Sequence, residues 1–290
     1  MKKEYIIISS ILLFKTVLCC NIFRNFTING PLNLKMFPFF NDFSAHSMTH
    51  TQVDNIIDGR QSCSQNQVPE IAKSHMKWVG SCYEKTWSKE LVEVLVQAAI
   101  NKTDFSPADY PYCVLDYYSA LNKYTVEGKR VLVAGSISPW NEAIFIAAGA
   151  RQVLTSEYSE LVSLDDRIKV LHASKLIHFE KFDAISSFSS IEHDGLGRYG
   201  DPINPSGDFN AISEFHYLLH PGGILYLGIP VSGKQGFIEG NLHRLYSFDR
   251  IYAMIKDKFE IVDIIEDHYK YYEVNRVDWQ HQPLIVLKKA

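Results

Sequence analysis

From residue 129 onward, short apolar runs alternate with segments of helical period. The apolar runs predict strands at residues 129–135, 151–155, 182–188, 224–229, 259–265 and 284–288. Segments with apolar residues three to four apart predict helices at residues 139–149, 208–219 and 247–255, and Pro-Gly-Gly predicts a turn at 221–223. Strands alternating with helices are typical of βαβ units. We therefore expect an α/β fold with a doubly wound, mostly parallel sheet.

Two more helices are predicted before the first strong strand. Residues 86–100 have apolar side chains at three-to-four spacing behind a Ser88 cap, and a second helix is expected at residues 112–124. Both would cover one edge of the sheet. Residues 21–75 are polar and lack a periodic apolar pattern, which predicts an irregular N-terminal extension or stalk. The folded domain is expected over residues 76–290.

Residues 1–20 have the pattern of a targeting segment. Lys2 and Lys3 precede a ten-residue apolar run, which is typical of a secretory signal peptide or a signal anchor. Lys15 interrupts the run, so an uncut membrane span is the weaker version, and an amphipathic or core helix is the alternative. We expect the secretory pathway, with the protein secreted or membrane-anchored in the lumen. A cytoplasmic location is the alternative.

Composition narrows the classes of function. Hydrophobic residues make up 46% of the 290 residues, and charged residues make up 21%, which are globular proportions. The formal net charge of −4 gives the whole chain no electrostatic footprint for a polyanion, so nucleic-acid binding is disfavoured. Two N-glycosylation sequons, at Asn25 and Asn101, agree with a secretory glycoprotein, although chance also produces such sequons.

Cysteine and histidine spacing gives no sign of a metal. Cys63, Cys82 and Cys113 lie outside the predicted targeting segment and include no CxxC pair, and no His pair has metal-ligand spacing. Neither a zinc site nor a disulfide framework is indicated, and at most one disulfide could form among these three cysteines.

In a doubly wound sheet, ligands bind outside the carboxyl ends of the strands. Gly135 lies at the first such end, and Pro139 then suits the first turn of a helix whose N-terminus could receive a carboxylate. Glu157 ends the next strand, about twenty residues further on, where a ribose-binding acid is expected. The alternatives are an ordinary turn at Gly135 and a solvated loop acid at Glu157.

Several strand ends together carry a family resemblance. VLVAGS at 131–136, TSE at 155–157, FDAISSFSSIEH at 182–193 and LLHPGGIL at 218–225 resemble the class I S-adenosylmethionine-dependent methyltransferases, whose Rossmann-like sheet has seven strands. More narrowly, GSISPW at 135–140 with SIEHDGLGRYGDP at 190–202 resembles a nematode-rich family known only as domain of unknown function 268 and regarded as methyltransferase-like. The resemblance covers roughly residues 75–290.

The resemblance implies S-adenosylmethionine as the cofactor. The positions that match the family's cofactor-binding motifs are Gly135, Ser136, Glu157, Ser189 and Glu192. The usual first turn of such enzymes has two or three glycines, whereas here only Gly135 is present, followed by Ser136, Ile137 and Ser138. This departure favours the alternative of a catalytically inactive protein with a methyltransferase fold that acts in binding or as a scaffold.

The loop at residues 190–202 contains the candidate bases. His193 titrates near neutrality and could accept a proton during methyl transfer, while a packing and cofactor-positioning role is the alternative. Asp194 is the alternative base, and His243, in the loop after the strand predicted at 224–229, is a further candidate base or substrate ligand. Arg198 could bind an acidic substrate group or pair with Asp201 or Asp194.

The leading hypothesis is therefore an enzyme that transfers a methyl group to an oxygen or nitrogen acceptor. The predicted compartment favours a luminal acceptor such as a glycan hydroxyl, with a small molecule as the other acceptor class. A dinucleotide enzyme is disfavoured, because no GxGxxG follows the first strand.

Overall fold

The computed structural model describes residues 85–107, 110, 112–199, 201, 203–232, 236–239, 242–265 and 282–290. These residues all belong to one compact unit of the chain. The predicted targeting segment (1–20) and the predicted extension (21–75) lie outside the described residues, so both stay predictions.

The described elements follow the predicted alternation of strands and helices. The helices are α4 (Lys89–Ile100), α5 (Cys113–Lys123), α6 (Trp140–Ala147), α7 (Gly207–Leu218) and α8 (Phe248–Ile255), with the 3-10 helices η4 (Ala173–His178) and η5 (Ile191–His193). The strands are β1 (Lys85–Trp87), β2 (Arg130–Ala134), β3 (Gln152–Glu157), β4 (Leu161–Ser163), β5 (Ile168–His172), β6 (Phe182–Phe188), β7 (Leu219–Gly228), β8 (Phe237–Glu239), β9 (His243–Leu245), β10 (Phe259–Ile265) and β11 (Leu284–Lys289).

The main sheet has seven strands in the order β10-β11-β7-β6-β2-β3-β5. Strands β7, β6, β2, β3 and β5 are parallel neighbours, and β11 lies antiparallel between β7 and β10. This confirms the predicted doubly wound, mostly parallel sheet of seven strands.

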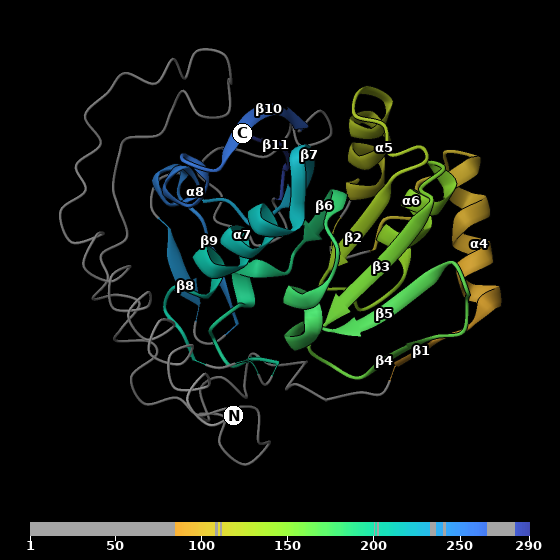
Figure 1. The fold of residues 1–290 in the computed structure, drawn as a ribbon, viewed down its shortest axis with the longest axis horizontal. Helices are drawn as coiled ribbons and strands as arrows, with labels where there is room; N and C mark the ends of the chain where they lie inside the picture. Colours follow the sequence, from red (N-terminus) through yellow and green to blue (C-terminus); the bar gives the residue numbers. More distant parts are fainter. Residues whose placement is uncertain are drawn as a thin grey trace, which may run out of the picture. The chain divides into compact units, whose positions relative to one another are not determined.

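Helices cover both faces of the sheet, with α4, α5 and α6 on one side and α7 and α8 on the other (Figure 1). On the first face, Val131 and Val133 of β2 share a core with Tyr117 of α5 and Phe145 of α6. Because successive side chains of a strand point to opposite faces, Leu132 faces the α7 side. All five of these side chains are buried.

The prediction that the first two helices together cover one edge of the sheet is wrong, because α4 packs near the edge strand β5 and α5 near the β10–β11 pair at the opposite edge. The crossover from β3 to β5 contains the short strand β4 and no helix, which leaves apolar surface beside α6. Helix α4 covers this surface, where its Val92 and Val96 pack with Ala143 of α6 and Ile168 of β5. The Ser88 cap of α4 is confirmed, since Ser88 Oγ accepts from the Leu91 N–H. Helix α5 packs against α6 and the β10–β11 pair on the same face.

Sequence patterns did not reveal five of the described strands and misplaced one turn. Strands β1, β4, β5, β8 and β9 have three to five residues each and lack a clear apolar run. The turn predicted at 221–223 lies inside β7, where the register with β6 shifts. Leu219 already pairs with Phe182, so the Pro-Gly-Gly residues form an irregularity within a strand rather than its beginning.

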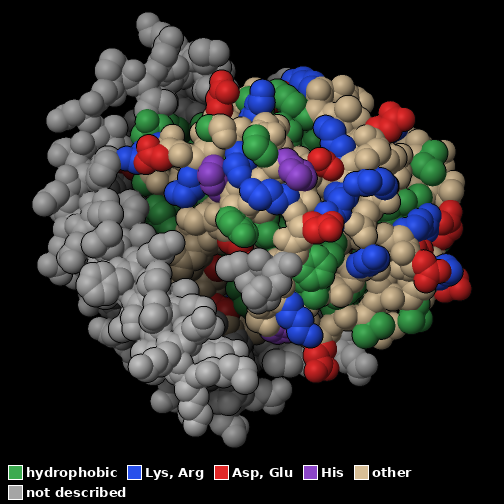
Figure 2. Space-filling view, in the orientation of Figure 1, with side chains coloured by type: hydrophobic (Ala, Val, Ile, Leu, Met, Phe, Trp, Pro, Cys, Tyr) green, Lys and Arg blue, Asp and Glu red, His purple; other side chains and the backbone are tan. Residues whose placement is uncertain are grey.

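None of the described helices combines the length and the apolar character needed to cross a bilayer. On the face shown in Figure 2, Lys, Arg and His side chains gather across the upper middle, and acidic side chains lie among them. The described part of this face therefore shows charges of both signs rather than a single-sign surface.

Candidate functional site

The residues predicted to bind a cofactor lie at the carboxyl edge of the parallel strands. Gly135 follows β2, Glu157 ends β3, and Ser189 follows β6. Because β6, β2 and β3 are parallel neighbours, the three positions lie at the same edge of the sheet. This is where doubly wound sheets bind their ligands.

The turn after β2 is in close contact with the loop after β6. Gly135 has a φ of +76°, a conformation that favours glycine. A Cβ atom at Gly135 would lie 2.1 Å from Oγ of Ser190. Gly135 therefore allows the close approach of Ser190, and the two loops form one continuous wall.

Glu157 bridges β3 to the turn after β2. Its Oε2 accepts a hydrogen bond from the Ser136 N–H at 2.9 Å, and its Oε1 accepts from the N–H groups of Tyr158 and Ser159 at 2.8 and 3.1 Å. A carboxylate oxygen can accept two hydrogen bonds. Oε2 therefore keeps one acceptor position, which fits a ribose hydroxyl.

Glu142, which the sequence did not single out as a site residue, lies beneath this turn. Its side chain is fully buried, with Oε1 accepting from Thr155 Oγ1 at 2.8 Å and Oε2 bonded to Ser136 Oγ at 3.2 Å. Burial raises the pKa of the Glu142 carboxyl to about 7. Both oxygens are bonded, so Glu142 holds the turn in place.

Ser189 is a strained residue at the centre of a polar network. Its φ of +48° is in the left-handed region, which non-glycine residues adopt at a cost. Its hydroxyl lies 2.6 Å from Glu192 Oε1, 3.0 Å from the Tyr110 hydroxyl and 3.0 Å from Gln282 Nε2. Tyr110 and Gln282 are far from Ser189 in sequence and belong to no motif, so sequence analysis missed them.

Glu192 is the least satisfied carboxyl of this network. Its side chain is 1% exposed, and burial raises its pKa to about 7. Oε1 is bonded to Ser189, whereas Oε2 has no hydrogen-bond partner among the described residues. Buried polar groups are rarely left without a partner, and such groups are candidates for function.

His193 lies next to Glu192 but is turned partly into the structure. Its Nδ1 is bonded to the Leu242 carbonyl, and because a carbonyl only accepts, the neutral ring carries its proton on Nδ1. Its Nε2 lies 3.5 Å from Glu192 Oε1. Burial, with the nearby Arg198, holds the pKa of His193 well below its ordinary value.

Arg198 and Asp201 each bind backbone groups in this region. Arg198 Nη1 donates to the Leu242 carbonyl at 2.9 Å. Asp201 accepts from the N–H groups of Gly195, Gly197 and Tyr199. These hydrogen bonds of the two side chains therefore attach the 190–202 loop to backbone N–H and carbonyl groups.

The other two predicted bases lie in the same region. Burial and Asp201 raise the pKa of Asp194 well above its ordinary value, and the Asp194 carbonyl accepts from Arg244 Nη1 at 2.6 Å. His243 begins β9, and its ring centre is 6.3 Å from that of His193. Burial, then Arg198, lowers the pKa of His243 to about 4. The structure thus gathers His193, Asp194 and His243, and their catalytic roles stay predictions.

A buried ion cluster, which sequence analysis did not identify, anchors this loop. Asp208 is fully buried and binds Arg250 through two hydrogen bonds of 2.8 Å, while Arg244 Nε lies 3.8 Å away. Burial raises the pKa of Asp208, but the two arginines outweigh it, so the pKa lies below its ordinary value.

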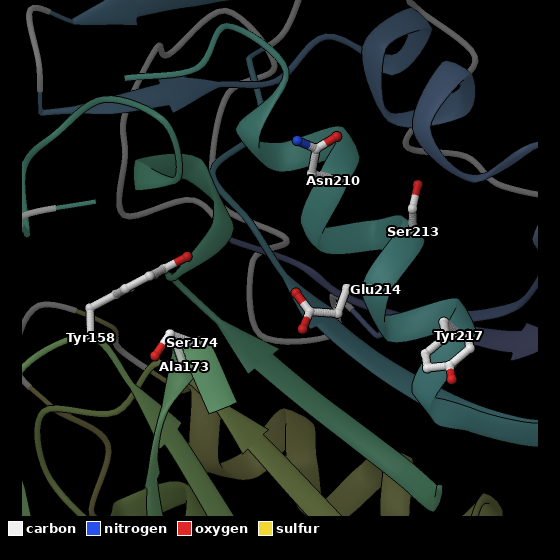
Figure 3. Close-up of a pocket in the computed structure, with 7 residues that line it drawn as sticks. All are labelled: Tyr158, Ala173, Ser174, Asn210, Ser213, Glu214 and Tyr217. Atoms are coloured by element: carbon white, nitrogen blue, oxygen red, sulfur yellow. The ribbon is translucent and has the colours of Figure 1, made fainter. Parts of the chain in front are cut away.

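A cavity of about 550 Å³ lies beside Glu157, between the ends of β3 and β5 and one face of α7 (Figure 3). Tyr158, Ala173 and Ser174 line it from the sheet side. Residues of α7 three to four apart line the opposite side: Asn210, Ser213, Glu214 and Tyr217. The connection from β5 to β6 contains only η4, which leaves this polar face of α7 uncovered. In the sequence, the signal for this cavity is the row of polar side chains three to four residues apart on α7.

The described residues include no group of three or more His, Cys, Asp or Glu placed to hold a metal ion. Cys113 is buried and free.

Comparisons with known proteins give one family and a set of similar folds. Residues 128–286 match the model of a family described as Caenorhabditis protein of unknown function, DUF268. Comparison with curated proteins finds no match.

Solved structures with a similar fold include three methyltransferases. The 1,6-didemethyltoxoflavin-N1-methyltransferase of Burkholderia thailandensis, with bound 1,6-didemethyltoxoflavin and S-adenosylhomocysteine, has a TM-score of 0.47 and 16% identity, and the match covers 69% of this chain and 87% of that one. The N-methyltransferase NodS of Bradyrhizobium japonicum, in complex with S-adenosylhomocysteine, has a TM-score of 0.42 and 12% identity. The match covers 69% of this chain and 97% of that one. An S-adenosylmethionine-dependent methyltransferase of Mesorhizobium loti has a TM-score of 0.40 and 15% identity. The match covers 60% of this chain and 97% of that one.

Proposed function

The chain belongs to the Caenorhabditis family of proteins of unknown function DUF268, and we propose that it transfers a methyl group from S-adenosylmethionine to an oxygen or nitrogen acceptor. One observation carries the proposal. The turn after β2, the acid that ends β3 and the loop after β6 form a single connected wall, through the Ser136–Glu157 hydrogen bond and the Gly135–Ser190 contact.

The residues present fit the chemical parts of this cofactor. Glu157 Oε2 keeps an acceptor position for a ribose hydroxyl. Beside it, the cavity offers the ring of Tyr158 and the hydroxyl of Ser174, which suit a flat, polar base. The turn from Gly135 into α6 would receive the amino-acid end at a helix N-terminus. When bound, the cofactor supplies an electrophilic methyl group on a positively charged sulfur.

The chain itself would position the acceptor and move its proton. In-line placement of acceptor and methyl group supplies much of the rate in such a transfer. Glu192, His193, Asp194 and His243 lie around the network at the end of β6 and are the candidates to accept or hold the proton. The buried setting of this network also excludes water from it.

A glycan hydroxyl in the secretory pathway is the acceptor that we propose, with a small molecule as the other class. This part rests on the targeting pattern of residues 1–20, which also supports membrane anchoring through that segment. The exposed sequon at Asn101, where α4 ends, is consistent with a luminal glycoprotein.

A protein that binds ligands without catalysis is the second candidate. The observation in its favour is the β2 turn, where Ser190 takes up the space beside Gly135 and Glu157 already bonds three backbone N–H groups.

Calorimetric titration of the full chain with S-adenosylmethionine and S-adenosylhomocysteine tests the proposal. Wild type should bind both, and Glu157→Ala should weaken binding by about 1–3 kcal/mol, because the ribose hydroxyl loses a charged acceptor. Glu160→Ala, which changes an exposed glutamate of the same loop, should bind as wild type does.

Two results would count against this proposal. Absence of binding of either compound to wild type refutes the cofactor. An unchanged dissociation constant in folded Glu157→Ala refutes the ribose role. Because Glu157 also holds the Ser136 turn, Glu157→Gln is a milder second variant that keeps one carbonyl acceptor.

A further inference from the structure

Glu192 stands out among the buried carboxyls at the sheet edge. Its Oε1 is bonded to Ser189 Oγ at 2.6 Å, and its Oε2 has no partner among the described residues, although the side chain is 1% exposed. Glu142 is equally buried, but both of its oxygens are bonded. Glu192 therefore retains an unused acceptor position inside the protein.

The surroundings fix the Glu192 carboxyl in place next to the cofactor wall. Ser189, which bonds it, is held in its strained conformation by Tyr110 and Gln282. The next residue, Ser190, contacts Gly135 in the turn after β2. Glu192 is thus two residues from Ser190, which contacts the turn proposed for the cofactor's amino-acid end.

Charged and titratable groups surround Glu192 on every side. The cations are Arg198 of its own loop and Arg244 of β9, and both favour the ionised carboxylate. The other carboxyl groups are Asp194 of the loop, whose pKa burial raises well above its ordinary value, and Asp208 of α7, which is bonded to Arg250 of α8. The neutral titratable groups are Tyr110, His193, His243 and Tyr246. The nearby charges are therefore mixed in sign, so the surroundings do not restrict the Glu192 carboxyl to its ionised form or to its protonated form.

We propose that Glu192 receives the proton released by methyl transfer, and that its ionisation is linked to the charge of the sulfonium. This inference rests on the proposed function. In the transfer, the methyl carbon–sulfur bond breaks as the bond from the acceptor oxygen or nitrogen to that carbon forms. The acceptor's O–H or N–H bond then breaks, and its proton passes to the Glu192 carboxylate.

Charge balance explains why this arrangement suits a buried site. Before transfer, the positive sulfonium is compensated by the negative carboxylate. After transfer, the sulfur is a neutral thioether and the carboxyl is a neutral acid. The buried pair therefore has no net charge at either stage, which avoids the large cost of an uncompensated buried charge.

His193 is less suited to this task. Its Nδ1 already donates to the Leu242 carbonyl, so only Nε2 could take the proton. The resulting imidazolium would be a buried cation near Arg198, a like charge that opposes protonation. His193 is better placed as a neutral partner that orients Glu192, whose Oε1 lies 3.5 Å from Nε2.

Proton release on cofactor binding tests the proposal without an acceptor. Calorimetry of the full chain at pH 7, in buffers of different ionisation enthalpy, gives the number of protons released with each ligand. Because the pKa of Glu192 is about 7, S-adenosylmethionine should release about half a proton more than S-adenosylhomocysteine, which has no sulfonium charge. Glu192→Gln should abolish this difference, and Glu160→Gln, at an exposed position of the loop after β3, should keep it.

The possible outcomes separate the two proposals. If neither compound binds, the proposed function fails. If both bind and release equal numbers of protons, or if Glu192→Gln keeps the difference, the role of Glu192 is refuted and the cofactor stands.

Wild type alone provides a second measurement should Glu192→Gln not fold. The affinity for S-adenosylmethionine relative to S-adenosylhomocysteine should rise about tenfold from pH 6 to 7.5, as the carboxyl ionises. A ratio that does not change with pH refutes the link.

Discussion

Glu142, in the helix after β2, and Glu192, in the loop after β6, are two buried glutamates, and burial raises the pKa of each to about 7. They differ in their hydrogen bonds. Glu142 is bonded through both oxygens, to Thr155 and Ser136, whereas Glu192 is bonded through one, to Ser189. The raised pKa alone therefore does not distinguish a structural carboxyl from a reactive one.

The count of hydrogen bonds does distinguish them. A fully bonded buried polar network makes a structure rigid, whereas an unbonded buried acceptor costs about 1–3 kcal/mol. Natural sequences retain such a cost mostly at functional sites. The difference assigns Glu142 to support of the β2 turn and Glu192 to chemistry.

The two glutamates are also held in different ways. Glu142 is in the first turn of α6, whose backbone hydrogen bonds hold it. Glu192 is in η5, a 3-10 helix of three residues, and depends on contacts from outside its own segment. Arg244 Nη1 donates to the carbonyls of Glu192 and Asp194, and the Asp208 cluster holds Arg244.

The largest expected effect comes from breaking that external support. Asp208→Asn leaves Arg244 and Arg250 buried without their carboxylate, which should destabilise the protein by about 3–5 kcal/mol. Chemical denaturation monitored by circular dichroism measures the loss.

The matched variant is Asp201→Asn in the same loop. Asp201 is also buried but accepts from backbone N–H groups, so its loss of charge should cost about 1–2 kcal/mol. Equal losses in the free energy of unfolding in the two variants would show that the Asp208 ion cluster supports the Glu192 loop no more than Asp201 does.

Much of the fold was predictable, because long strands and helices have strong apolar periods. Strands β6 and β10 have the predicted bounds, and β2 and α7 differ from prediction by one residue at each end. Strand β5 was missed, because its exposed and partly exposed positions show no apolar run. The position of α4 was also not predicted. Helix α4 covers the surface that a helix between β3 and β5 would otherwise cover, and this is apparent only once the strand order is known.

The candidate site was predictable only where a motif marked it. Gly135, Glu157 and the 190–202 loop were found from their places at strand ends. Tyr110 and Gln282 were missed, because they reach Ser189 from segments that are 79 and 93 residues away in sequence. The motif after β6 marked Glu192 and not Glu142, but it could not show which carboxyl has an unbonded oxygen, because that depends on the folded hydrogen-bond network.

The second prediction concerns stability against pH. Both glutamates have a pKa of about 7 when folded, above the ordinary value of 4.5, so between these values the folded protein binds more protons than the unfolded chain. Their contribution is therefore fully present below about pH 4.5 and is lost as the pH rises through about 7. Glu142→Gln and Glu192→Gln should each reduce the stability lost between pH 5 and 8 by about 1–3 kcal/mol.

Urea denaturation at several pH values measures these slopes. Glu160→Gln, at an exposed position, serves as the control and should keep the wild-type slope. A wild-type stability that rises from pH 5 to 8 with no change in either buried variant would contradict the shared protonation of the two sites.

The smallest effect is expected at Ser189, where strain and hydrogen bonding can be separated. Both Ser189→Ala and Ser189→Gly remove the hydroxyl that bonds Glu192, Tyr110 and Gln282. Only the glycine variant also relieves the φ of +48°. Ser189→Gly should therefore be more stable than Ser189→Ala by about 1 kcal/mol, measured by thermal or urea denaturation. No such left-handed residue lies in α6 near Glu142, so strain is a feature of the Glu192 side alone among the described residues of these two segments. Should the two variants be equally stable, the backbone at Ser189 is unstrained. The difference between Glu192 and Glu142 then lies only in the unbonded Oε2 of Glu192.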